Sequence, residues 1–208
     1  MSSKIGIIDY GMGNLRSVEK GLEKAGTTCD IISDPDALAG YPGLILPGVG
    51  AFADAMTNLK ERGMDVAIIG CIESGKPLMG ICLGMQLLLE FSDEHGRSEG
   101  LGVVPGGVVR LPATVKVPHM GWNVLHQHGE QPLFDSIEEG SRFYFVHSYY
   151  CDPSDESWII GTAPYGLEFA CAIGRDNVLG VQFHPEKSSL LGLRMLSNFA
   201  DIVEASSA

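Results

Sequence analysis

The first half of the chain alternates short apolar runs with amphipathic helical patterns. The predicted strands cover the mainly apolar residues 4–9, 43–48 and 78–82 and the more mixed residues 27–33. The helical patterns cover residues 14–25, 53–62, 64–73 and 85–91. Runs this short, and apolar at almost every position, are typical of strands that are buried on both faces. Because strands that alternate with helices form parallel sheets, this half predicts a parallel sheet covered by helices.

The second half has a different pattern. After about residue 92, strand-like segments rich in β-branched and aromatic residues are separated by Gly and Pro, and residues 167–183 predict a hairpin with its turn at 174–177. A final helical pattern covers residues 189–203. No repeat or long linker interrupts the 208 residues. The sequence therefore predicts a single α/β domain over residues 1–208, with a mainly parallel central sheet flanked by helices and a more antiparallel second half.

Composition and charge narrow the class of protein. The formal net charge of −12 argues against a nucleic-acid backbone as the main partner. The five cysteines are odd in number and form no CxxC pair, which favours a reducing compartment over a disulfide framework or a zinc cluster. The N-terminal residues lack a secretory pattern, and the longest apolar run is too short to cross a bilayer. We therefore expect a cytoplasmic protein with no metal site, no nucleic-acid partner and no membrane partner.

The segment Gly80-Ile81-Cys82-Leu83-Gly84 has the form G-x-nucleophile-x-G. It follows a predicted strand and precedes a predicted helix, which is the context that a nucleophile elbow requires. At such an elbow the free N–H groups and the dipole of the helix favour a thiolate. The amide of Leu83 would then point at an oxyanion that forms nearby. The alternative is a structural cysteine that packs as a small apolar side chain, and the strand–helix context favours the elbow.

A nucleophilic thiol needs a general base and a group that orients this base. Among the six histidines, His184 differs because it ends a strand-like run and is followed by Pro185 and Glu186. Strand ends face the ligand cleft of α/β sheets, and proline stiffens the step to Glu186, whose carboxylate could then bond the far nitrogen of the ring. Taken alone, this segment is better explained as a strand end closed by a turn.

A Gly-rich segment, residues 46–52 (LPGVGAF), ends the third predicted strand. It lies at the same predicted sheet edge as Cys82 and His184, and such a loop can present backbone N–H groups to an oxyanion. An ordinary turn is the alternative. The case for nucleophilic catalysis is the conjunction of the elbow, the His-x-Glu at a later strand end and the Gly-rich loop.

These segments resemble a known family. PGVGAF, GICLGMQLL and GVQFHPEKS closely resemble the class I, triad-type glutamine amidotransferases. Within that class, DYGMGN and KVPHMGWN resemble the glutaminase subunits of imidazole glycerol phosphate synthase, an enzyme of histidine biosynthesis. The resemblance runs from about residue 4 to the last helix with no departure at these motifs. It implies a flavodoxin-like core for the parallel half.

The resemblance also implies residue roles. In the implied Cys82–His184–Glu186 triad, Cys82 attacks the carboxamide of glutamine and releases ammonia. The implied oxyanion donors are the amides of Leu83 and of Val49 or Gly50. The residues implied to contact substrate glutamine are Gln86, Glu94, His147, Ser148 and Tyr149. The residues implied to face a partner subunit are Asn14, Met120, Trp122, Asn123 and Lys187. Plainer roles stay open for three of these: Gln86 on a helix surface, Trp122 in the core and Lys187 as a solvated charge.

The partner that the resemblance implies is a cyclase subunit with a (β/α)8 barrel, which would form a heterodimer with this chain. The barrel must be a separate chain, because 208 residues are too few for both parts. The cyclase would use the ammonia to make imidazole glycerol phosphate and an aminoimidazole carboxamide ribotide. No phosphate-binding or dinucleotide fingerprint occurs, so we expect no cofactor on this chain.

Two alternatives and one expectation about regulation remain. The same elbow and triad would serve a hydrolase or an amidotransferase with another acceptor, and a non-catalytic subunit could keep the fold without activity. Because a glutaminase that acts alone would waste glutamine, we expect low activity until the cyclase and its ligand are bound. Residues 47–50 are the segment expected to adjust, since glycine tolerates backbone changes at little cost.

Overall fold

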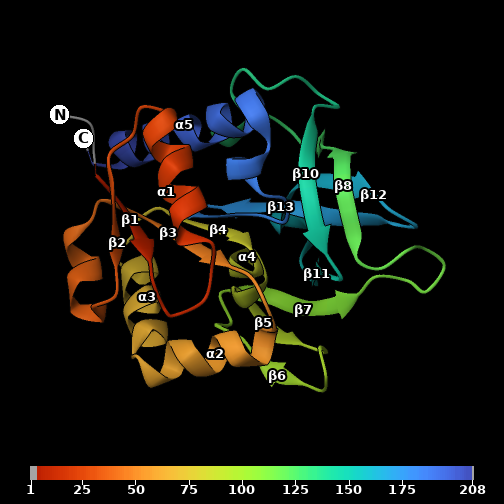
Figure 1. Cartoon of the computed structure of the whole chain (residues 1–208), viewed down its shortest axis with the longest axis horizontal. Coiled ribbons are helices and arrows are strands. Elements are labelled where there is room, and N and C mark those ends of the chain that lie inside the picture. The colour runs from red at the N-terminus through yellow and green to blue at the C-terminus, as the bar shows by residue number, and fades with distance from the viewer. Residues whose placement is uncertain (1–3, 208) are drawn as a thin grey trace.

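The computed structural model describes residues 4–207. One large sheet runs through the molecule, helices cover both of its faces, and a small second sheet lies beside its later strands (Figure 1). No helix in the described range is both long and apolar enough to span a membrane.

The predicted elements of the first half are present. The strands are β1 (Ile5–Ile8), β2 (Cys29–Ile32), β3 (Gly43–Gly48) and β4 (Leu78–Cys82). The helices are α1 (Leu15–Lys24), the 3-10 turn η1 (Pro35–Gly40), α2 (Phe52–Glu61), α3 (Met64–Glu73) and the short α4 (Leu83–Leu87). The predicted bounds of β3, β4 and α3 match the observed ones.

The second half is mostly strands. These are β5 (Leu89–Ser92), β6 (Ser98–Glu99), β7 (Val104–Arg110), β8 (His119–Val124), β9 (His126–Gln127), β10 (Arg142–His147), β11 (Tyr149–Pro153), β12 (Ile159–Pro164), β13 (Glu168–Arg175) and β14 (Val178–Val181). Three 3-10 turns lie among and after them: η2 (Pro132–Phe134), η3 (Glu156–Trp158) and η4 (Pro185–Lys187). The chain closes with α5 (Ser189–Ser206).

The parallel core has the strand order β2-β1-β3-β4-β14, with all four pairings parallel. This is the flavodoxin-like order that the resemblance implied. Side chains alternate between two core layers along each strand. Ile45 packs into the layer under α1 and α5, whereas Leu44 and Leu46 pack into the layer under α2 and α3. A parallel sheet buried in this way explains why its strands are apolar at nearly every position.

The helix predicted for residues 85–91 is wrong in its second part. Helix α4 ends at Leu87, and the next residues form β5, which pairs with β7 in parallel and with β6 antiparallel. The carbonyl oxygen of Leu87 accepts from Leu101 N, and that of Leu88 accepts from Val103 N and Val104 N. These bonds to a distant segment replace the helical ones, so tertiary pairing overrides the local helical pattern.

The antiparallel half is joined to the core through a hairpin. Strand β13 pairs with β14 and with β11, which in turn pairs with β7. The hairpin was predicted, but its turn is tighter than expected, because Arg175 already pairs with Val178. Strands β8 and β10 form the separate two-stranded sheet. The polypeptide leaves that sheet at Ser148 and joins the large sheet as β11.

The register places three strand ends together. Gly48 at the end of β3 pairs with Cys82 at the end of β4, and Val181 at the end of β14 pairs with Ile81. The segments that follow these strands therefore leave the sheet side by side. This edge, formed by the carboxyl ends of parallel strands, is where α/β sheets bind ligands.

Candidate active site

Cys82 forms a sharp turn between β4 and α4. Its φ of 56° and ψ of −111° lie in a region that residues with a side chain rarely adopt. Neither Gly80 nor Gly84 has a positive φ, so their role is close packing: a Cβ on Gly80 would lie 2.7 Å from the backbone of Gly84, and one on Gly84 would collide with the carbonyl oxygen of Leu46. The glycines bring the backbone segments together, while the cysteine itself carries the strain, as functional residues often do.

His184 and Glu186 follow the end of β14. His184 Nδ1 lies 2.8 Å from Glu186 Oε1, and the two side chains are 3% and 1% exposed. Because a carboxylate accepts, Nδ1 carries the proton and Nε2 faces away from Glu186. His184 Nε2 is buried and has no hydrogen-bond partner among the described residues. The ring therefore has one nitrogen fixed by Glu186 and the other free for Cys82.

The charged form of His184 is favoured. Burial alone lowers the pKa of His184, but Cys82 and Glu186 together raise it to about 9. A histidine with such a pKa holds its proton at neutral pH, so the geometry favours an imidazolium next to Cys82. Burial lowers the pKa of His147, on the same cavity, to about 3. The two histidines of this cavity therefore differ in charge.

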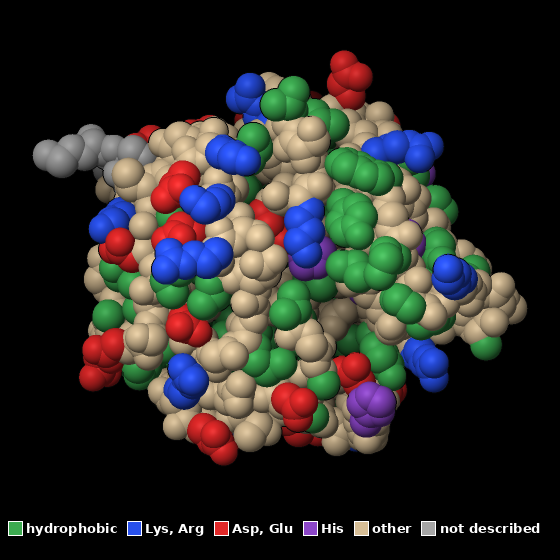
Figure 2. All heavy atoms as spheres, in the orientation of Figure 1, with side chains coloured by type: hydrophobic (Ala, Val, Ile, Leu, Met, Phe, Trp, Pro, Cys, Tyr) green, Lys and Arg blue, Asp and Glu red, His purple; other side chains and the backbone are tan. Residues whose placement is uncertain are grey.

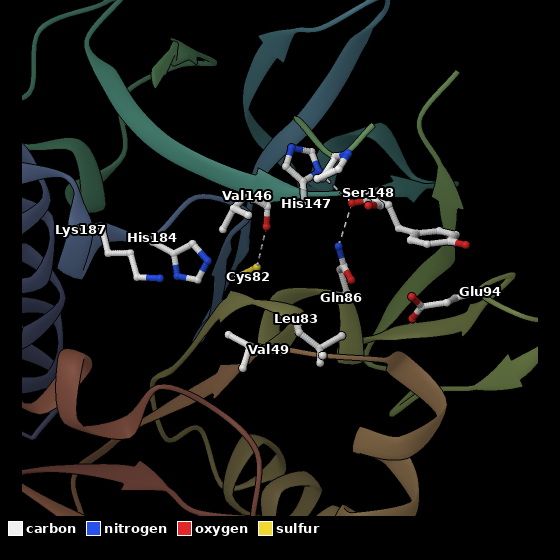
Figure 3. Close-up of a pocket in the computed structure, with 13 residues that line it drawn as sticks. Val49, Cys82, Leu83, Gln86, Glu94, Val146, His147, Ser148, His184 and Lys187 are labelled. Carbon is white, nitrogen blue, oxygen red and sulfur yellow. Dashed lines mark hydrogen bonds between the residues drawn. The ribbon is translucent and has the colours of Figure 1, made fainter. Parts of the chain in front are cut away.

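A cavity of about 290 Å³ opens between these residues and the antiparallel strands. Cys82, Leu83 and Gln86 line it from the elbow side, and the segment from Val146 to Tyr149 lines it from the opposite side (Figure 3). Its volume is at the lower end of the range for small-molecule sites. All the predicted catalytic, oxyanion and substrate residues line it except Glu186, which lies behind His184.

The Gly-rich loop forms the lower wall of the cavity in Figure 3. Val49 and Gly50 line the cavity, and Val49 is 40% exposed. Gly50 has a φ of 103°, a conformation that strongly favours glycine. The loop thus begins beside Cys82, where Gly48 pairs with it, and leaves its backbone at the cavity surface.

The side chains of Gln86 and Glu94 both form hydrogen bonds within the protein. Gln86 is buried, which rules out a helix-surface position, and its Nε2 donates to the Tyr149 carbonyl and to Gln182 Oε1, at 2.9 Å each. Its oxygen remains the group that can accept from a ligand. Glu94 Oε2 accepts from Phe52 N at 2.7 Å, so this carboxylate stabilises the N-terminus of α2 while also facing the cavity.

The residues predicted to face a partner lie in different places. Met120 and Trp122 are 64% and 49% exposed and project to one side of β8, and Figure 2 shows apolar side chains gathered over β8 and β10. Trp122 is therefore not a core residue. Asn14 is exposed before α1, and Lys187 lines the cavity. Asn123 points the other way from Met120 and Trp122, and its Nδ2 donates to the Pro164 carbonyl at 2.8 Å.

Three residues of the site were not singled out by the sequence analysis. Pro118 and Val146 line the cavity, and the Cys82 thiol lies 3.9 Å from the Val146 carbonyl oxygen. Gln182 Nε2 lies 3.7 Å from Cys82 Sγ. A signal for Gln182 was present, because it stands two residues before His184 and so shares its side of an extended segment. Pro118 and Val146 carry no such signal.

Comparisons with known proteins identify the family to which this chain is similar. Residues 6–203 match the family model described as Glutamine amidotransferase class-I. The imidazole glycerol phosphate synthase subunit HisH of Moorella thermoacetica is 55% identical over 199 residues, which is 96% of this chain and 95% of that protein. HisH of Geobacter sulfurreducens is 50% identical over 207 residues, covering 96% and 99% of the two chains. The solved structure of PurLQS from Thermotoga maritima is 20% identical, covers both chains completely with a TM-score of 0.77, and so shares the fold.

Proposed function

This chain belongs to the class I glutamine amidotransferase family and, within it, to the HisH subunits of imidazole glycerol phosphate synthase, and we propose that Cys82, His184 and Glu186 carry out its glutamine hydrolysis. It is a glutamine amidotransferase subunit of histidine biosynthesis. The observation that supports the residue roles is the strained cysteine elbow in one cavity with His184, whose other ring nitrogen bonds a buried carboxylate.

The proposed reaction begins from an ion pair in which His184 Nε2 has already taken the proton of Cys82. The thiolate attacks the side-chain carboxamide carbon of glutamine. The oxyanion accepts from the amide of Leu83 and from that of Val49 or Gly50. His184 then protonates the departing nitrogen, ammonia leaves, and water hydrolyses the glutamyl thioester to glutamate and free thiol. Glu186 orients the ring and stabilises its cation throughout.

The proposed substrate contacts follow from the cavity walls. Gln86 offers its free side-chain oxygen to the substrate amino group, because its N–H groups are already used. Glu94 faces the same space as a negative charge that suits an ammonium group. The segment His147–Tyr149 closes the opposite side, where Ser148 marks the break between β10 and β11.

The proposed partner is a cyclase subunit with a (β/α)8 barrel, bound as a heterodimer. Met120 and Trp122 expose apolar side chains, and they are proposed to contact this partner together with Asn14, Asn123 and Lys187, which lie elsewhere on the molecule. The cyclase receives the ammonia and performs the lyase reaction, which therefore belongs to the partner. We also place the chain in the cytoplasm, on the support of its five free cysteines.

The test is ammonia release from glutamine by the purified chain. It is measured alone, with a barrel-type cyclase subunit, and with that subunit plus its phosphorylated nucleotide ligand. Strong stimulation in the last mixture is the expected result. Full activity in the chain alone would contradict the proposed gating by the partner. No release in any mixture, with Cys82 unreactive towards a glutamine analogue that alkylates thiols, would contradict the catalytic assignment.

A further inference from the structure

Gln182 is a fully buried amide with a polar contact to the nucleophile. Its side chain is 0% exposed, and its Nε2 lies 3.7 Å from Cys82 Sγ. Its backbone N donates to the Cys171 carbonyl at 2.8 Å, which fixes the residue at the end of β14. A buried amide is costly unless its groups are paired, so the direction in which this amide points matters for the thiol.

The orientation of Gln182 follows from its neighbour Gln86. The Tyr149 carbonyl can only accept, so the atom of Gln86 that faces it at 2.9 Å must be the amide nitrogen. The second N–H of that nitrogen is directed at Gln182, 2.9 Å away, and therefore requires the oxygen of Gln182. The nitrogen of Gln182 is left on the other side, where it faces Cys82 Sγ. Gln182 thus donates to the sulfur.

The Tyr149 carbonyl oxygen also determines the directions of the hydrogen bonds that join His147, His119 and Asn123. His147 Nδ1 lies 2.8 Å from the Tyr149 oxygen and must donate, which leaves His147 Nε2 as an acceptor in the neutral ring. His119 Nδ1, 2.9 Å from it, must then donate, and His119 Nε2 accepts from Asn123 Nδ2 at 3.5 Å. Burial lowers the pKa of His119 to about 4 and that of His147 to about 3, so both rings stay neutral.

We propose that Gln182 is a positioning residue that donates a hydrogen bond to the Cys82 thiolate, and that it is held in that orientation by the hydrogen-bond chain that runs from Asn123 through His119, His147, the Tyr149 carbonyl and Gln86. This inference rests on the proposed function, in which Cys82 is the nucleophile. An N–H donor favours the charged form of an acceptor, so the contact favours the thiolate over the thiol. The hydrogen-bond chain also connects the sulfur to β8, because His119 and Asn123 belong to this strand, which carries the proposed partner surface.

The charge states of the other groups around Cys82 are compatible with a neutral hydrogen-bond donor to its sulfur. His184 is its charged neighbour, as described above. Burial raises the pKa of Tyr10 and of Cys151, the two further titratable groups that interact with Cys82, so both stay neutral. Four other titratable side chains line the cavity, namely the neutral His147 and the side chains of Glu94, Tyr149 and Lys187. Gln182 thus brings a neutral side-chain donor to the sulfur, and it is not among the residues that line the cavity.

The first experiment measures alkylation of Cys82 by iodoacetamide against pH in the full chain, with the modified residue identified by peptide mass spectrometry. Gln182→Met keeps the length of the side chain but removes the N–H, and Gln182→Asn keeps an amide that is one methylene shorter. Asn198→Leu is the matched control, because it removes another buried amide that donates two hydrogen bonds, in α5 and outside this chain of bonds. Thermal unfolding of each variant shows whether it is folded.

The expected result for both Gln182 variants is that the midpoint of alkylation moves up by about one pH unit and the rate near neutral pH falls about tenfold. In the complex with the cyclase, kcat for glutamine hydrolysis falls by a larger factor than KM for glutamine rises, because the contact with the sulfur acts on the nucleophile. A folded Gln182 variant with the midpoint of the wild type would overturn the proposal, as would an equal shift in Asn198→Leu.

The second experiment tests the far end of the chain of bonds. His119→Phe keeps the aromatic stacking on Tyr165 and Phe145 but removes both ring nitrogens. We expect a smaller shift of the alkylation midpoint in the same direction, about 0.3 units, and no further shift when it is added to Gln182→Met. An unchanged midpoint, or a shift that adds fully to that of Gln182→Met, would overturn the role of His119.

Alkylation needs no glutamine turnover, so a failed ammonia assay with these shifts intact would count against the proposed function alone.

Discussion

The parallel and antiparallel halves of the molecule contribute different parts of the site. In the parallel half, every residue of β3 is buried, and the ends of β3, β4 and β14 hold the Gly-rich loop, Cys82 and the segment of His184. In the antiparallel half, β10 alternates between buried and more exposed positions and supplies one wall of the cavity. The antiparallel half also carries the exposed Met120 and Trp122.

This difference separates the proposed chemistry from the proposed recognition. A strand that is buried on both faces is packed from both sides, so a side chain at its end can occupy only a narrow range of positions. A strand with one free face can carry a surface for a partner without disturbing the core. We therefore expect substitutions in the parallel half to affect catalysis or folding, and substitutions on the exposed face of β8, at Met120 and Trp122, to affect assembly.

The largest effect is expected for Cys82→Ala. Without the thiol, glutamine-dependent synthesis in the complex should fall by at least about ten-thousandfold, since no other group replaces a nucleophile. Synthesis from added ammonium salt should persist, because it bypasses the glutaminase. Cys71→Ala, at a cysteine of α3 outside the cavity, is the control and should keep both activities. Glutamine-dependent synthesis that survives in Cys82→Ala would refute the proposed mechanism.

Glu186→Gln is expected to reduce glutamine hydrolysis by about a hundredfold to a thousandfold. The amide keeps the shape of the carboxylate but removes the charge that stabilises protonated His184, and it can turn an N–H towards the ring. The rate is measured as ammonia release in the full complex, with ammonium-dependent synthesis as the internal control. A variant with the wild-type rate would show that Glu186 is a turn residue and not part of a triad.

The same variant gives a test of stability against pH. Burial alone lowers the pKa of His184, but Cys82 and Glu186 raise it from 6.5 to about 9, so the folded state binds this proton more tightly than the unfolded state. The stabilisation is complete below about pH 6.5 and is lost as pH rises through about 9. The difference in free energy of unfolding between the wild type and Glu186→Gln should therefore shrink from pH 6 to pH 10. A difference that grows with pH would contradict the pairing.

Gly84→Ala tests the packing of the elbow. The added Cβ would collide with the carbonyl oxygen of Leu46, a backbone atom that cannot rotate away, so we expect a loss of about 3 kcal/mol in the free energy of unfolding. Gly70→Ala is the matched control, because it lies within α3 with open space around it, and it should be neutral or stabilise the fold by up to about 1 kcal/mol. Equal effects of the two substitutions, measured by chemical denaturation, would refute the packing role of Gly84.

The two halves also differ in how far the sequence predicts them. Strands β3 and β4 have the predicted bounds, and Cys82 and His184 lie in one cavity as expected, because buried runs and strand-end motifs are local signals. Strand β5 was missed because its pairing with residues 98–108 has no counterpart in its own periodicity. The contact between His119 and His147, 28 residues apart, likewise depends on the pairing of β8 with β10 and leaves no local pattern.

The smallest effect is expected for Trp122→Ala, and it bears most directly on the division between the halves. Trp122 is half-exposed and packs edge-on against Tyr144, so its removal leaves little empty space in the core. We expect the Kd for the cyclase to rise about thirtyfold, as for a central aromatic residue of an interface. Alkylation of Cys82 in the free chain should not change, because Trp122 faces away from the hydrogen-bond chain that begins at Asn123. Val66→Ala, at another exposed apolar position on α3, should leave the Kd unchanged. An unchanged Kd in Trp122→Ala would place the partner elsewhere, whereas a loss of Cys82 reactivity in the free chain would mean that this face of β8 also supports the catalytic edge.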